Sequence, residues 1–431
     1  MKFIADLHIH SKFSRATSKD MTFDTLAYWA KVKGIRLLAT GDFTHPEWLF
    51  LMKEKLEPAG NGFLRFKNGV QPPENPFLKT ISSPASDVSF ILSSEISFIY
   101  SKMGKVKKIH LIVLAPDFES VEKINTKLSG IGNLRSDGRP ILGMDVKPFL
   151  KMVADSCPRC VVIPSHIWTP WFSLFGANSG FDTIEECFEE MTPFIFALET
   201  GLSSDPPMNR RLAALDRYAL VSNSDAHSPT KIGRESNVFD TDFSYPGMIG
   251  ALKAKDPARF LHTVEFFPEE GKYHFDGHRK CGVLFSPRES LAHGDICPKC
   301  GKKLTIGVLH RVEELADRGP DDDVPAGIPH KNLIPLNEII AEALEKTAEC
   351  QSVWDVYFRF IREFGDEYTI LTEVPVAELI RLPPERVGQG IDRMRKGKVK
   401  IVPGHDGFYG TIQIFGGDAG AEEATPQLSL F

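Results

Sequence analysis

The amino-acid sequence predicts an α/β protein with a parallel β/α barrel, a small zinc-binding module and a C-terminal helical domain, in that order. Three observations lead to this prediction. Several apolar, strand-like runs end at, or are interrupted by, residue types that bind metals. A His-x2-Cys pair and a Cys-x2-Cys pair follow these runs. Apolar residues at helical spacing then recur in the last part of the chain.

The chain opens with the run KFIADLHIHS, in which His8 and His10 stand two residues apart. Successive side chains of an extended strand point to opposite faces, so these two imidazoles share a face and can bind the same cation. Asp225 and His227 repeat this spacing after the run ALVSNS. Both pairs are therefore candidate metal ligands.

Three further polar residues interrupt or end apolar runs. Glu95 follows SFILSS, His110 lies in KIHLIVLAP, and His166 ends CVVIPSH. Ligands at the C-terminal ends of strands are typical of parallel β/α barrels, whose loops build the active site. A glutamate between two imidazole sites can bridge two cations. Any single histidine would be better explained as a core or surface residue, but the joint pattern favours a polynuclear metal site.

The runs DLHIHS, IPSH and SDAH, with Glu95 and His110 between them, resemble the motifs of the polymerase and histidinol phosphatase (PHP) superfamily over residues 1–240. The resemblance implies a distorted (β/α)7 barrel that holds up to three Zn, Mn or Fe ions and hydrolyses phosphoesters. For this chain we expect two or three divalent cations, Zn, Mn or Mg, in the barrel.

The same resemblance implies the ligand sets. One metal would bind His8, His10, Glu95 and Asp225, a second would bind Glu95, His110 and His166, and a third would bind Asp42 and His227. The chain departs from the family pattern near the third set. Many members have a histidine where Ser14 and Arg15 stand, and the usual Thr-Asp-His reads Gly41-Asp42-Phe43. His45 could substitute as a ligand, and Arg15 could contact a substrate phosphate or be an ordinary surface residue.

A second metal-binding pattern lies downstream. Its members are His278, Cys281, Cys297 and Cys300, and short spacing within each pair lets each half form a knuckle around one structural, tetrahedral zinc. His274 and His293 are alternatives to His278. Cys157 and Cys160 have no second pair nearby, and we interpret them as structural, with a redox pair or a metal site as alternatives.

After the module, the Pro- and Asp-rich stretch DRGPDDDVPAGIPHKN predicts a linker. Helices are predicted in LNEIIAEALEK, VWDVYFRFIREF and VAELIRLPPERVGQGIDRMRKGK, and a β-hairpin is predicted around residues 404–407. The predicted domain organisation is a barrel over 1–265, a zinc module over 272–310, a linker over 317–331, a helical DNA-binding domain over 332–415 and a tail over 416–431.

This arrangement and the stretches TGDFTHPEW, CGVLFSPRESL, GVLHRVEELADR and LIPLNEIIAEAL resemble one subgroup of the superfamily, the endonuclease Q family, across nearly the whole chain. The resemblance implies a repair endonuclease that nicks DNA on the 5′ side of a deaminated base, such as uracil, hypoxanthine or xanthine, or of an abasic site. Asp225 is the candidate catalytic residue, because it stands at the metal cluster and can accept a proton from the attacking water.

Candidate DNA contacts follow from local patterns, since the net charge of −6 does not favour nucleic-acid binding. Besides Arg15, the candidates are Trp168 and Trp171 as stacking rings, and Arg393, Arg395 and Lys396 as phosphate contacts. Core packing for the rings and a solvated face for the basic run are the alternatives.

The tail ends in QLSLF, which resembles the peptide that docks bacterial repair proteins on the sliding clamp. Gln427, Leu428, Leu430 and Phe431 would bind the clamp, and the motif suggests a bacterial source. A frayed terminus with chance apolar residues is the alternative.

The chain has 431 residues, 42% of them apolar, and no apolar stretch long enough for a membrane span. Seven cysteines without a secretory pattern predict reduced thiols and a cytoplasmic location. The expected partner is lesion-containing DNA, and no membrane is expected. Two other functions stay open: a small-molecule phosphomonoesterase on the same barrel, and a catalytically silent DNA-binding adaptor.

Overall fold

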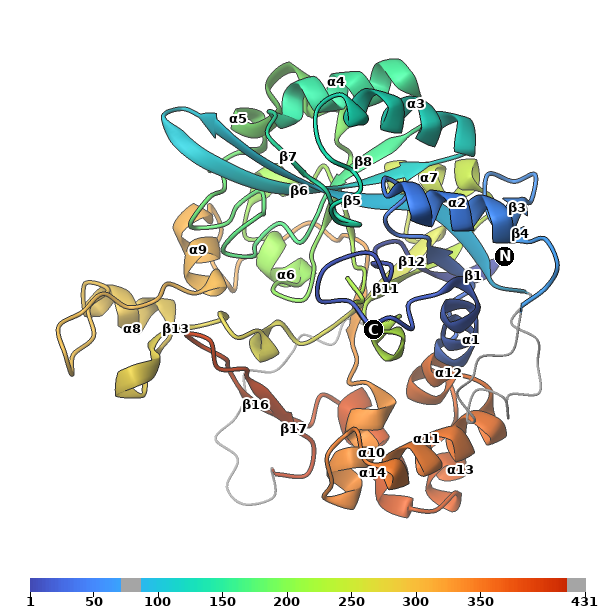
Figure 1. The fold of residues 1–431 in the computed structure, drawn as a ribbon. Coiled ribbons are helices and arrows are strands. Elements are labelled where there is room, and N and C mark those ends of the chain that lie inside the picture. Colours follow the sequence, from blue (N-terminus) through green and yellow to red (C-terminus); the bar gives the residue numbers. More distant parts are fainter. Residues whose placement is uncertain (71–86, 417–431) are drawn as a thin grey trace.

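The computed structural model describes residues 1–70 and 87–416, and it confirms the α/β fold class that the sequence predicts. Figure 1 shows a strand-rich body, a small module that projects from it, and a group of helices on another side of the body. The module is drawn in yellow and gold, and the helices in orange and red.

The body is a closed barrel. Seven of the described strands form its wall: β1 (Lys2–Asp6), β2 (Leu37–Ala39), β5 (Ser89–Lys102), β6 (Lys105–Ala115), β8 (Val161–Pro164), β9 (Ala197–Glu199) and β10 (Ala219–Val221). Ladders join β1 to β2, β2 to β5, β5 to β6, β6 to β8, and β9 to β10. A backbone hydrogen bond from Ile167 to Glu199 and a bridge between Ile9 and Ala226 close the ring.

The barrel differs from the predicted parallel one at β6, which runs antiparallel to both of its neighbours. The physical reason is the turn between β5 and β6. Met103 and Gly104 have φ values of 55° and 72°, which are typical of a tight hairpin turn, so the chain reverses at once. Glu95 and His110 therefore lie within long paired strands, and the expectation that they stand at strand ends is wrong.

Helices pack around the barrel wall (Figure 1). They are α1 (Phe23–Lys33), α2 (Pro46–Lys55), α3 (Phe118–Ser129), α4 (Val146–Ser156), α5 (Ile184–Phe188), α6 (Pro206–Asn209) and α7 (Tyr245–Ala254). Strands β1, β2, β5, β6 and β8 of the wall belong to one 11-stranded sheet of the described residues. Its other strands are β3 (Leu56–Pro58), β4 (Leu64–Phe66), β7 (Ile141–Leu142), β11 (Ser236–Asp240), β12 (Phe260–Glu265) and β15 (His330–Asn332).

Helix α4 illustrates how the sequence forms these elements. Its N-cap residue, Asp145, accepts a hydrogen bond from the backbone N–H of Lys147. The buried side chains Val146, Phe149 and Val153 recur at helical spacing and face the barrel core. Phe149 packs against Phe98 of β5 at a ring distance of 4.6 Å. The core thereby fixes the strand that carries Glu95.

The projecting module contains β13 (Asp276–His278), β14 (Val283–Phe285), α8 (Pro287–Ala292) and α9 (Val308–Leu315). The predicted hairpin near the C-terminal end is confirmed, with β16 (Lys400–Val402) antiparallel to β17 (Thr411–Gln413). Its connecting loop contacts the module through a bridge between His405 and Phe275.

The predicted C-terminal helices are confirmed. They are α10 (Leu336–Leu344), α11 (Gln351–Phe364), α13 (Val376–Arg381) and α14 (Glu385–Arg395), and a short helix that we did not predict, α12 (Glu367–Thr372), lies among them. In α11 the residues Val353, Val356, Tyr357 and Phe360 form the buried face at helical spacing.

A buried ion pair joins these helices to the barrel. Lys33 Nζ of α1 lies 2.6 Å from Glu367 Oε2 of α12, and both side chains are almost fully buried. The Tyr357 hydroxyl and the Leu336 N–H also donate hydrogen bonds to Glu367. Because an unpaired buried charge is costly, this contact holds the two parts together.

The stretch predicted as a linker is attached to the barrel near both of its ends. Arg318 forms an ion pair with Asp216, and His330–Asn332 forms strand β15, parallel to β12. Its prolines and acids were expected to oppose a strand, but the free edge of β12 supplies the pairing partner. The exact domain boundaries stay predictions. No helix within residues 1–70 and 87–416 has the length and apolar character that crossing a membrane needs.

Candidate metal centre and zinc module

The barrel brings the predicted ligands together at one end of its interior. Among the described residues, three groups of side chains have potential ligand atoms within 4.8 Å of one another: His8, His10 and Glu95; His10, Asp225 and His227; and Glu95, His110 and His166. The groups share members, so they form one continuous cluster. Most of these side chains are buried, and Asp225 and His227 are half-buried.

Glu95 lies at the middle of the cluster. Its Oε1 atom is 3.0 Å from both His110 Nδ1 and His166 Nε2, and 3.7 Å from His8 Nε2. Its Oε2 atom is 3.4 Å from His10 Nε2. One carboxylate thus lies between two pairs of imidazoles, which is the position of a bridging ligand between two cations.

Three buried atoms of the cluster have no hydrogen-bond partner among residues 1–70 and 87–416: His8 Nε2, His10 Nε2 and Asp225 Oδ1. Asp225 Oδ1 lies 3.1 Å from His10 Nε2 and 3.7 Å from His8 Nε2. Leaving such polar atoms buried and unpaired costs stability. A divalent cation between them would satisfy all three, so the donor set fits a metal.

The Nδ1 atoms of His8 and His10 each contact a carboxylate outside the ligand groups. His8 Nδ1 is 3.0 Å from Glu199 Oε1, and His10 Nδ1 is 3.1 Å from Asp42 Oδ1. These contacts fix the ring orientations and direct both Nε2 atoms into the cluster, as partners of metal-binding histidines commonly do.

The placement of Asp42 corrects the expected third ligand set. Its carboxylate accepts hydrogen bonds from the backbone and side chain of Ser11 and from Ser14, in addition to its contact with His10. It therefore positions His10 and belongs to none of the ligand groups in the described residues. His227 instead joins His10 and Asp225, with its ring centroid 4.5 Å from that of His10.

The suggested replacement ligand, His45, does not take a ligand position. His45 stacks on Phe13 with ring centroids 4.4 Å apart, and it also lies outside the ligand groups of the described chain. Arg15 has a 77% exposed side chain and forms an ion pair with Asp137. Its predicted contact with a substrate phosphate stays a prediction.

Two residues of the site were missed from the sequence. Glu199 ends the short buried strand β9, so the signal of a polar residue after an apolar run was present. Arg139 lies in a loop without any pattern, and its Nη1 atom is 3.0 Å from Glu95 Oε2. The Arg139 side chain is 26% exposed, so it can face both the cluster and a bound phosphate.

The electrostatics of the cluster favour cations. Burial opposes the charged form of His8, but Glu199, Glu95 and Asp225 raise its pKa well above the usual value. Burial likewise opposes ionisation of Glu95, but His110, His8 and Arg139 hold its pKa well below the usual range. Burial lowers the pKa of His110 to about 4, so this imidazole is neutral at pH 7 and its lone pair is available to a metal.

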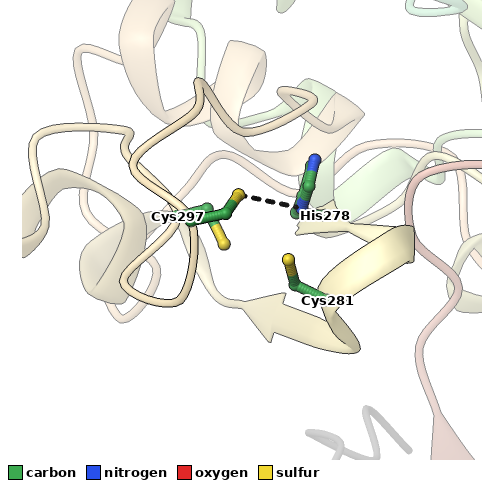
Figure 2. Close-up of side chains that lie close together, drawn as sticks. His278, Cys281 and Cys297 are labelled. Carbon is green, nitrogen blue, oxygen red and sulfur yellow. Dashed lines mark hydrogen bonds between the residues drawn. The ribbon is translucent and has the colours of Figure 1, made fainter.

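In the module, the four predicted zinc ligands gather as one group: His278, Cys281, Cys297 and Cys300. Figure 2 shows the side chains of His278, Cys281 and Cys297 pointing toward a common centre. The alternatives to His278 lie elsewhere, since His274 stacks on Phe275 and His293 stacks on Phe285. This Cys/His cluster could hold a structural zinc.

A further group within the module, Asp276, Asp295 and His310, was not predicted. Asp276 accepts hydrogen bonds of 2.6 Å from both His310 Nδ1 and the backbone N–H of Gly307. Such short contacts are those of a hydrogen-bond network, and they fix the start of α9 on β13.

The Cys157 and Cys160 thiols are both free. Burial raises the pKa of Cys160, so it stays protonated, and neither cysteine belongs to a ligand group in the part of the chain that the structure describes. These observations agree with a structural role.

The candidate DNA-contacting residues differ in their exposure and in their hydrogen bonds. Trp168 is only 1% exposed and donates its indole N–H to Asn209, so the expectation that it stacks on a base is wrong. Trp171 is 44% exposed. Arg395 was expected to contact phosphate, but its guanidinium donates to the carbonyls of Ile370, Leu371 and Val374.

The neighbours of Arg395 are also engaged. Arg393 donates to the carbonyl of Ile414. Lys396 forms an exposed ion pair with Asp392, which leaves its stem accessible to solvent. The predicted contact of Lys396 with phosphate stays a prediction. The predicted clamp-binding residues, Gln427, Leu428, Leu430 and Phe431, lie outside the described residues.

Sequence comparisons identify relatives of the whole chain and of its parts. The family model described as "MJ0043 C-terminal domain" matches residues 335–398. The chain is 35% identical over 262 residues to the uncharacterized protein MJ0043 of Methanocaldococcus jannaschii, covering 58% of this chain and 31% of that protein. It is 28% identical over 436 residues to the uncharacterized protein YqxK of Bacillus subtilis, covering 96% and 99% of the two chains. The chain thus spans about a third of the length of the archaeal relative.

Two solved structures are similar over nearly the full length. One is PfuEndoQ, described as a lesion-specific endonuclease from Pyrococcus furiosus, with a TM-score of 0.82, 30% identity, and coverage of 96% of this chain and 95% of that one. The other is endonuclease Q in complex with a 27-mer duplex substrate that has an abasic lesion at the active site. Its TM-score is 0.80 at 30% identity, with 96% of each chain covered.

We predict that Glu199→Gln weakens binding of divalent cations to the barrel by roughly 10- to 100-fold, because the His8 ring loses the carboxylate that orients it. A competition titration of metal-free protein with Mn and a chelating dye measures this. Glu119→Gln, an exposed substitution on α3, is the matched control. Equal affinities in the wild type and Glu199→Gln would show that this carboxylate does not support the metal centre.

We also predict that Cys297→Ala lowers the zinc content of the purified protein by about one equivalent and makes residues 272–310 sensitive to protease, because a structural site needs its full ligand set. Elemental analysis and limited proteolysis measure both effects. Cys160→Ala should retain the zinc. Unchanged zinc content in Cys297→Ala would contradict the proposed ligand set.

Proposed function

The chain belongs to the endonuclease Q family, and we propose that it is a metal-dependent DNA endonuclease that hydrolyses the phosphodiester on the 5′ side of a damaged nucleotide. The proposed lesions are deaminated bases, such as uracil, hypoxanthine and xanthine, and abasic sites. The observation that carries the proposal is the cluster around Glu95, with its three unpartnered ligand atoms.

In this proposal the barrel residues hold two cations that share Glu95. His8, His10 and Asp225 would complete one site, and His110 and His166 the other. Bound divalent cations lower the pKa of a water toward about 7 and neutralise charge on the phosphate oxygens. A third cation near His227 would have to bind without Asp42, because Asp42 is engaged with His10, Ser11 and Ser14.

The protein's own groups would orient the reaction. The Asp225 side chain is 26% exposed while its Oδ1 atom faces the histidines, so it borders both the cluster and the solvent. It would orient the attacking water and accept its proton. Arg139 would bind the phosphate oxygens through its guanidinium, on the side of Glu95 that faces away from His110.

We predict that Asp225→Asn lowers the rate of nicking by at least about a hundredfold, because it removes the group that orients the water. DNA affinity should stay within a few-fold of the wild type. The measurement is a gel assay with Mg or Mn on end-labelled duplexes that contain one uracil, one hypoxanthine, one abasic site or no lesion, together with fluorescence anisotropy on the same duplexes.

Asp155→Asn, an exposed substitution on α4, is the matched control for the loss of one charge. Wild-type nicking by Asp225→Asn would contradict the assignment of this residue. If the wild type nicks none of the duplexes but releases phosphate from a small monoester, the phosphomonoesterase is supported instead. If it binds DNA and hydrolyses neither substrate, the chain is an adaptor.

We further propose that the terminal sequence QLSLF binds a bacterial sliding clamp, which would raise the local concentration of the enzyme on DNA. Deleting residues 427–431 should leave nicking of free DNA unchanged and lower clamp affinity below detection in a surface-binding assay. Gln427→Ala alone should weaken binding by about tenfold, the size of one lost polar anchor. Equal clamp affinity after the deletion would refute this part of the proposal.

A further inference from the structure

Aromatic side chains from three separate segments, Trp171, Tyr273 and Tyr409, come together at the module through ring and cation contacts, and Phe408 precedes Tyr409 in the same loop. Trp171, Phe408 and Tyr409 are 44%, 50% and 74% exposed, and Tyr273 is half-buried. Together with Lys272 we call them the aromatic platform. Large exposed patches of this kind mark binding sites on soluble proteins.

A cation lies within the platform. Lys272 Nζ is 5.7 Å from the ring centroid of Tyr273 and 5.7 Å from that of Tyr409. Trp171 meets Tyr273 edge to face, with centroids 5.8 Å apart and an interplanar angle of 77°. Rings that alternate with a basic side chain are the pattern by which proteins bind unpaired nucleotides: the bases stack on the rings and the cation meets the backbone.

The loop that carries Phe408 and Tyr409 is held rigidly. The backbone N–H groups of Gly404, Gly407 and Gly410 donate to the carbonyls of Glu269, Lys272 and Glu270, respectively. A Cβ atom on Gly404 or Gly410 would collide with the backbone of this neighbouring segment, so only glycine allows so close an approach.

The zinc module supports the same loop. Asp406 accepts a hydrogen bond of 2.6 Å from the backbone N–H of Arg279, the residue after the zinc-ligand candidate His278. Its other oxygen accepts a hydrogen bond of 2.7 Å from the Thr305 hydroxyl. The module thereby fixes the backbone of the loop that carries the exposed rings, which lowers the entropy cost of binding.

The platform is continuous with the metal centre. Phe172, next to Trp171, accepts a hydrogen bond from the backbone N–H of His110, and its ring lies 4.7 Å from the His110 ring. Burial raises the pKa of Glu269 to about 7 and that of Glu270 to about 8, so these two carboxyls beside the loop carry less negative charge at neutral pH than ordinary glutamates.

We propose that the aromatic platform binds unpaired bases of the DNA strand that passes the metal centre, with Tyr409 and Trp171 stacking on bases and Lys272 contacting a phosphate. This inference rests on the proposed function, because it assumes that DNA is the ligand. It assigns Tyr409, Trp171 and Lys272 as positioning residues that hold the strand and take no part in the hydrolysis.

The test compares Tyr409→Ala and Tyr409→Phe in the full-length protein. The probe is a duplex with one abasic site and a neighbouring 2-aminopurine, whose fluorescence falls when the base stacks on a ring. Tyr409→Ala should raise Kd by about tenfold, the size of one base–ring stack, and lose most of the quenching. Tyr409→Phe keeps the ring and should stay within about twofold of the wild type.

Salt dependence separates stacking from charge. Tyr409→Ala should leave the slope of log Kd against log salt concentration unchanged. Lys272→Ala should reduce this slope by about one, which corresponds to the loss of one phosphate contact. Phe50→Ala removes a 68% exposed ring on α2, outside the platform, and is the matched control. Its Kd and quenching should equal those of the wild type.

Kd and quenching of Tyr409→Ala equal to the wild type would overturn the proposal, and so would an equal loss in Phe50→Ala. Nicking of the same duplex in Mn is measured in parallel. A wild type that nicks while Tyr409→Ala binds normally overturns the platform and leaves the proposed function in place. A wild type that binds through Tyr409 but does not nick supports the platform and overturns the proposed chemistry.

Discussion

The side chain of Glu95 is the constraint on which the rest of the site depends. A single buried carboxylate faces imidazoles that arrive from β6, from the end of β8 and from the segment after β1. The barrel brings these segments to one point. The cluster of buried carboxylates around it attracts positive charge, and the large apolar core offsets the cost of keeping unpaired ligand atoms there.

Local patterns predicted most of the fold. Apolar runs marked the barrel strands, and helical spacing in VWDVYFRFIREF marked α11, because burial of one face decides both patterns. The direction of β6 was not predicted, since it depends on a two-residue turn at Met103 and Gly104. The pairing of His330–Asn332 with β12 was also missed, because a free strand edge elsewhere in the chain decides it.

The same distinction applies to the site. His8 and His10 could be placed on one face from their spacing, and the Cys/His pairs could be recognised from theirs. Arg139 and the true role of Asp42 could not, because both depend on which side chain lies opposite in space. Trp168 and Arg395 show the converse error: aromatic and basic residues near a site can be structural, and only burial and hydrogen bonding reveal it.

The buried pair between Lys33 and Glu367 has a mechanical consequence for recognition. Moving the C-terminal helices away from the barrel would break this pair and the hydrogen bonds that Tyr357 and Leu336 donate to Glu367, so the contact opposes a change in the span between the helices and the metal centre. In the proposed function, a duplex that contacts both parts would have to bend to fit them, and the stiffness of the DNA would then contribute to recognition. An abasic nucleotide softens the duplex at one step, and such softness would be sensed at a distance from any base contact.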